Sequence, residues 1–105
     1  MNLIVERAQE VVDDVARARS RRAFFSALEH FERVLALAPE YPPGMLTDTD
    51  VQSLSAFADT VLAQIEDRLD RHTDRASVQR TLVGKVYEIR RHVENIYMTT
   101  HGIVA

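Results

Sequence analysis

Apolar residues recur every three or four positions over most of this chain, the spacing that places them on one face of an α-helix. The first such stretch covers residues 3–38 and contains neither glycine nor proline. A polar, arginine-rich segment divides its apolar positions into two sets: Ile4, Ala8, Val11, Val12, Val15 and Ala16, then Ala23, Phe24, Ala27, Leu28, Phe31, Val34 and Leu35. We favour one long helix over 3–38, bent near Ser20. The alternative is two helices that join at Ser20.

Two further stretches show the same spacing. Pro39 ends the first stretch, because proline lacks the backbone N–H that a helix needs, and Thr49 with Gln52 resembles a capping box at the next helix start. A helix is predicted over 50–72, with the seam Val51, Leu54, Ala58, Val61, Ile65 and Leu69. Another is predicted over 75–99, with the seam Leu82, Val86, Ile89, Val93 and Ile96. Inside it, Gly84 indicates a close approach of two helices, or alternatively a functional contact of its backbone.

These elements predict an all-α fold in a single helical domain over residues 1–105. We expect three long helices (about 3–38, 50–72 and 75–99) in an antiparallel bundle, or four if the first helix breaks near Ser20. An unbroken first helix would be about 54 Å long, against about 35–39 Å for the others. Its overhang would expose apolar residues, and a second copy of the chain is the simplest cover. We therefore expect a homodimer, unless a break at Ser20 allows a monomeric four-helix bundle.

Composition narrows the class of protein. Of the 105 residues, 46% are hydrophobic and 28% are charged, which is ordinary for a folded domain and too apolar for a disordered one. The net charge of −3 argues against a protein built to coat nucleic acid. There is no cysteine, and therefore no disulfide or thiol nucleophile. The sequence shows no signal peptide and no apolar run long enough to cross a bilayer, so we expect a cytoplasmic protein without membrane contact.

No pattern of catalytic residues is visible. The chain lacks a glycine-rich phosphate loop, a G-x-S-x-G turn and an H-E-x-x-H motif. Glu88 and His92 could supply two ligands to a metal, but no second pair accompanies them. We therefore expect no enzyme activity, no cofactor and no metal site.

Candidate partner-binding residues gather around the polar segment of the first stretch. Four arginines within six residues could grip phosphates or an acidic partner surface. We favour the view that they are solvated, or that they pair in a dimer with the acidic stretch 66–70. Phe25 points about 100° away from Phe24 on a helix, so it is either part of a wide core or an anchor for another chain. The candidates are Arg17, Arg19, Arg21, Arg22, Phe25 and Tyr41.

The sequence therefore predicts a non-enzymatic, regulatory or protein-binding helical bundle. The alternative is a regulator associated with nucleic acid through the basic cluster between Arg17 and Arg22.

Overall fold

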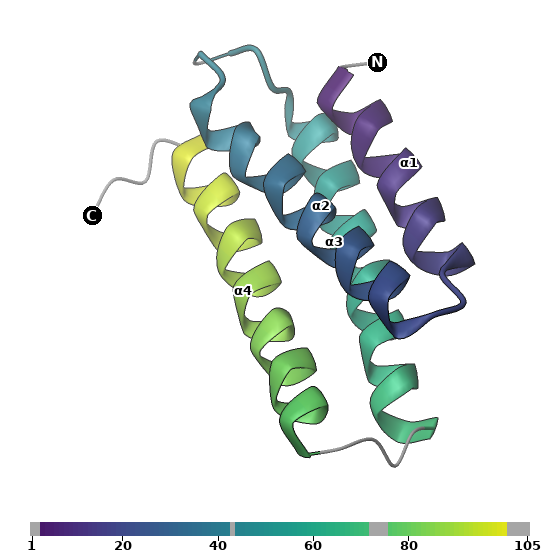
Figure 1. Cartoon of the computed structure of the whole chain (residues 1–105). Coiled ribbons are helices and arrows are strands. Elements are labelled where there is room, and N and C mark those ends of the chain that lie inside the picture. Colours follow the sequence, from purple (N-terminus) through teal and green to yellow (C-terminus); the bar gives the residue numbers. More distant parts are fainter. Residues whose placement is uncertain (1–2, 43, 72–75, 101–105) are drawn as a thin grey trace.

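The computed structural model describes residues 3–42, 44–71 and 76–100, and within them the chain forms four α-helices and one short 3₁₀ helix. The α-helices are α1 (Leu3–Arg17), α2 (Arg21–Leu37), α3 (Asp48–Arg71) and α4 (Ala76–Thr100). The 3₁₀ helix η1 (Ala38–Glu40) directly follows α2 and contains Pro39. The predicted all-α bundle is therefore confirmed, in its four-helix form (Figure 1).

The predicted continuous helix over 3–38 is wrong, because the chain reverses direction at Ser20 (Figure 1). Ser20 has an extended backbone (φ −112°, ψ 157°), and its hydroxyl oxygen accepts a hydrogen bond from the Ala23 backbone N–H at 3.1 Å. This bond satisfies one of the backbone donors that a helix start leaves without a partner. The reversal also lets the two apolar sets of this stretch pack in one core, whereas a continuous helix would carry one of them away from the bundle.

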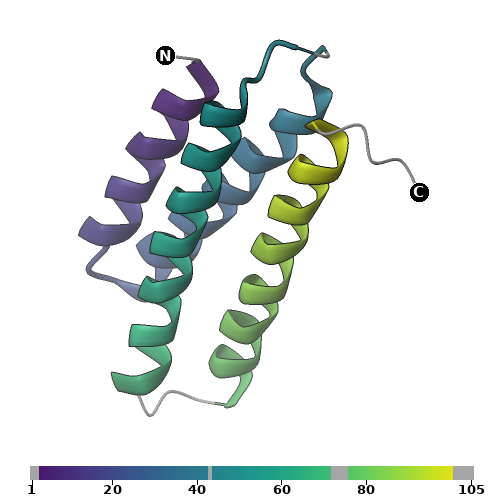
Figure 2. The ribbon, with the colours of Figure 1, turned by 180° about the vertical axis from the view of Figure 1, so that it is seen from behind.

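The four helices lie at the corners of a square. Helix α1 packs against α2 and α3, and α4 packs against the same two helices. Successive helices run in opposite directions, as predicted, and the segment between Glu40 and Asp48 crosses one end of the bundle (Figures 1 and 2). Because this connection joins diagonal corners, α1 and α3 are parallel neighbours, as are α2 and α4.

The core lies between the four helices and is hydrophobic throughout the described residues. Each helix contributes a stripe of buried side chains, as its apolar spacing predicts. The largest fully buried side chains are Phe24, Phe31, Leu28, Leu35, Leu54, Ile65, Ile89 and Ile96.

Two local predictions need correction. The start of α3 is capped by Thr47 and Asp50 rather than by Thr49 and Gln52. Each backbone N–H of that pair donates to the other residue's side-chain oxygen at 3.1 Å. Gly84 does not mark a close helix approach, because a Cβ added there would meet no atom within 4 Å. The backbone of Gly44 has φ +86°, a conformation that favours glycine, in the connection before α3.

Unequal helix lengths produce a step at one end of the bundle. Helices α3 and α4 have 24 and 25 residues, whereas α1 and α2 have 15 and 17. The far ends of α3 and α4 therefore extend past the turn between α1 and α2 (Figure 1). The candidate functional site lies at this step.

Candidate functional site

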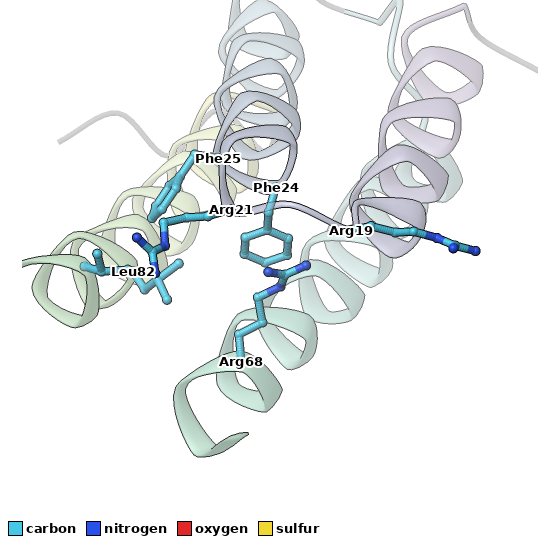
Figure 3. A pocket seen from close by; sticks show the side chains of 7 residues that line it. Arg19, Arg21, Phe24, Phe25, Arg68 and Leu82 are labelled. Atoms are coloured by element: carbon cyan, nitrogen blue, oxygen red, sulfur yellow. The ribbon is translucent and has the colours of Figure 1, made fainter. Parts of the chain in front are cut away.

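A pocket of about 170 Å³ lies at the step, where the start of α2 faces the extended ends of α3 and α4. We call it the arginine pocket. Helix α2 contributes Arg21 and both of its first phenylalanines, the preceding turn contributes Arg19, α3 contributes Arg68, and α4 contributes two apolar residues. The full lining is Arg19, Arg21, Phe24, Phe25, Arg68, Val78 and Leu82 (Figure 3).

The guanidinium of Arg68 is held in a fixed position. Its central carbon lies 4.0 Å from the centroid of the Phe24 ring, a stacking that combines cation–π attraction with apolar contact (Figure 3). Its Nη2 donates a hydrogen bond to the backbone oxygen of Ala18 at 2.8 Å. A guanidinium carries five N–H donors, and this bond uses one of them. Arg68 is half-buried and pairs with no carboxylate among the described residues.

The surroundings of Arg68 favour an anion. No carboxylate is among the described residues that line the pocket. The first turns of α2 and α4 border it, and neither turn contains an acidic residue within the described chain. Because the N-terminal end of a helix carries a partial positive charge, both ends add to the field of the arginines. The two phenylalanines with Val78 and Leu82 supply apolar walls, so the pocket can hold a group that is negatively charged and partly apolar.

The structure brings together only some of the predicted partner-binding residues. Arg19, Arg21 and Phe25 line the arginine pocket, although the side chain of Arg19 points away from Phe24 and Arg68 (Figure 3). Arg17 pairs with Asp14 instead, at 3.3 Å. The remaining two lie outside the pocket: Arg22 is exposed on α2, and Tyr41 packs against the core at the opposite end of the bundle.

Sequence reasoning missed Arg68, which it assigned to an acidic stretch facing solvent or a second copy. One signal was present: Arg68 follows Val61 and Ile65 at the four–three spacing of the α3 seam, so it lies on the inward side of its helix. Phe24 was expected in the core and is buried there. One face of its ring is covered by the Arg68 guanidinium. Phe25 packs against the core and also lines the pocket. Its role as an anchor for another chain stays a prediction.

A second polar cluster joins α2 to α4. Lys85 Nζ donates to Glu32 Oε2 at 2.9 Å and lies 3.5 Å from Glu88 Oε2. The side chains of Glu32 and Lys85 are only 12% and 15% exposed, whereas Glu88 is 58% exposed. Glu32 Oε1 is buried and accepts no hydrogen bond from the described residues. Two carboxylates here share one ammonium group.

This sharing changes the proton affinities of the cluster. Burial, followed by the hydrogen bond that a protonated Glu32 makes with Glu88, raises the pKa of Glu32 to about 7. The same hydrogen bond lowers the pKa of Glu88. Burial opposes the charge on Lys85, but the hydrogen bonds and negative charges of Glu32 and Glu88 together outweigh burial and raise the pKa of Lys85. Burial lowers the pKa of the half-buried His92 one turn further along α4.

The described part of the chain holds no group of three or more histidine and acidic side chains arranged to bind a metal ion. None of its helices is long and apolar enough to cross a membrane. No family model matches the chain, and comparisons with curated proteins and with solved structures also find no match.

Proposed function

We propose that this protein is a non-enzymatic binding module that recognises an acidic segment of a partner protein through the arginine pocket. The observation that carries the proposal is the state of Arg68. Its guanidinium is stacked on Phe24 and hydrogen-bonded to Ala18, yet most of its donors remain available inside a pocket with apolar walls. A group held in place before binding loses little entropy when a ligand carboxylate arrives. Arginine also binds carboxylates with two parallel hydrogen bonds, which adds geometric selectivity.

The apolar walls favour a peptide over a small inorganic anion. Phe25 and Val78 are half-buried, so each keeps part of its apolar surface available to a ligand. Aromatic and arginine side chains in partly desolvated pockets are typical anchors of protein interfaces. We therefore expect an acidic residue of the partner to reach Arg68 while a neighbouring apolar side chain covers Phe25.

The proposal is tested by fluorescence anisotropy with a labelled peptide that alternates glutamate and phenylalanine. Arg68→Met keeps an apolar stem beside Phe24 and removes the charge, and it should weaken binding at least about tenfold, as loss of a charged hydrogen bond predicts. Arg33→Met, which removes an exposed arginine of α2 that does not line the pocket, is the control and should change binding little. Equal binding by both variants would refute the proposal, provided that circular dichroism shows intact helices.

The alternative, association with nucleic acid, is an outcome of the same assay. A labelled DNA duplex replaces the peptide, and the salt concentration is varied. Binding of DNA that weakens steeply with salt, without binding of the peptide, would overturn the proposal in favour of the alternative.

The homodimer stays a prediction, but the reason for it no longer applies. That reason was the overhang of a continuous first helix, and the reversal at Ser20 removes this overhang. A mass of 12.0 kDa in light scattering would identify a monomer, and twice that mass a dimer.

A further inference from the structure

A second hollow continues from the arginine pocket along the surface between α2 and α4. It has a volume of about 310 Å³ and is lined by Phe25, Glu29, Ser77, Val78, Thr81 and Lys85. The two hollows share Phe25 and Val78, which form the ridge between them. We call the combined surface the α2–α4 groove. A ligand that places a carboxylate at Arg68 can therefore extend over Phe25 into the second hollow.

The second hollow differs from the first in charge. Its lysine, Lys85, is already neutralised by Glu32 and Glu88. The hydroxyl of Thr81 donates to the backbone oxygen of Ser77 at 2.9 Å. Glu29 is exposed, and no hydrogen bond or ion pair joins it to another of the described residues. The groove therefore presents the Arg68 guanidinium at one end, an apolar ridge in the middle and an unpaired carboxylate at the other end.

The length of the groove sets the spacing of a matching ligand. The Arg68 guanidinium lies over Phe24, and Glu29 follows Phe24 by five residues on α2, which is about 8 Å along the helix axis. An extended peptide advances about 3.3–3.6 Å per residue. Five residues also turn Glu29 about 140° around α2 from Phe24, so its carboxylate lies farther from Arg68 than this axial rise. Side chains that face one surface alternate along an extended chain, so the acidic, apolar and basic residues of a matching ligand occupy every second position, and its two charges are four residues apart.

We infer that the α2–α4 groove binds an extended segment of a partner protein in which an acidic, an apolar and a basic residue occupy alternate positions. The acidic side chain pairs with Arg68, the apolar side chain packs on Phe25 and Val78, and the basic side chain pairs with Glu29. This inference rests on the proposed function of the arginine pocket and adds the specificity of its ligand. Charge complementarity at both ends selects such a segment over a uniformly acidic one.

The test compares labelled peptides of equal length by fluorescence anisotropy. One set carries glutamate, phenylalanine and lysine at the required spacing, in both chain orders, and the matched peptides replace either lysine or glutamate with glutamine. The lysine peptide in one of the two orders should bind about two- to fivefold more tightly than its glutamine counterpart, which is the range for an exposed ion pair. Glu29→Gln should abolish that difference and leave the glutamine counterpart unaffected. Glu94→Gln, an exposed glutamate of α4 outside the groove, should change nothing.

Exchanging the charges of Glu29 and the peptide lysine gives a second test of their pairing. Glu29→Lys should weaken binding of the lysine peptide and strengthen binding of a peptide with glutamate in its place. If the glutamate peptides bind with full dependence on Arg68 but irrespective of lysine, the inference is overturned and the proposed function stands. If no peptide binds, both are overturned.

Discussion

The buried carboxyl of Glu32 should make the folded protein less stable as the pH rises from about 5 to about 8. Its pKa is about 7 in the folded chain and 4.5 in the unfolded one, so folding disfavours the ionised form. The stabilisation of the protonated form is fully present below the unfolded pKa and is lost as the pH rises through the folded pKa. At about 1.4 kcal/mol per pKa unit, the loss between pH 5 and pH 8 is about 2–3 kcal/mol.

The other ionisable groups near Glu32 change the folding stability with pH in different directions. Glu88 has a lowered pKa, so its contribution is lost only as the pH falls below its unfolded value. His92 has a lowered pKa and adds stability as the pH rises toward its unfolded value of 6.5, which partly offsets the effect of Glu32. Lys85, with a raised pKa, keeps its charge throughout this range. A variant at Glu32 itself isolates its contribution.

The assay is urea unfolding of the wild-type protein and Glu32→Gln at several pH values, followed by circular dichroism. Glutamine resembles the protonated acid, so Glu32→Gln should be about 2–3 kcal/mol more stable relative to wild type at pH 8 than at pH 5. Glu29→Gln, an exposed glutamate on the same helix, should show no such trend. A pH dependence that is the same in wild type and Glu32→Gln would refute the reasoning.

Three further changes test the fold. Ser20→Ala removes the cap of α2 and should cost about 1 kcal/mol in urea unfolding, and an unchanged midpoint would contradict the role of the cap. Gly84→Ala should stabilise the protein by about 1 kcal/mol and raise Tm by a few degrees, because the added Cβ meets no atom. A lower Tm would instead indicate a close helix contact. Phe31→Ala should cost about 3–5 kcal/mol because its ring is fully buried, while the exposed Leu37→Ala should cost little; similar losses in both would disprove this assignment of the core.

The periodic apolar seams made the helices predictable from the sequence. The break at Ser20 was not predictable, because opposing local preferences compete there. The seams of α3 and α4 identify Leu54, Ile65 and Ile89 as core residues, and all three are fully buried. Around Ser20, arginine and alanine are good helix formers, whereas serine favours a helix start. Local preference alone does not decide between a bend and a break, and the outcome depends on which arrangement buries both apolar sets.

The candidate site was predictable only in part for a related reason. Arg21 and Phe25 stood out as part of an unusual local cluster, but Arg68 lies far along the chain. Hydrophobic spacing shows which face of a helix is buried, but it does not show which helices become neighbours. The Glu32–Lys85 pair was missed for the same reason, since it exists only because α2 and α4 pack together.

The diagonal connection between Glu40 and Asp48 divides the molecule into two helical hairpins, α1–α2 and α3–α4. Contacts within each hairpin join consecutive elements, whereas docking of the two hairpins joins elements farther apart along the chain, so loop closure costs less entropy within a hairpin than between hairpins. The connection therefore acts as a linker. It keeps the two hairpins close together and so sets the effective concentration at which they dock. A protease cut in this segment would turn an intramolecular docking into the association of two fragments, and the stability of the whole would then depend on their concentration.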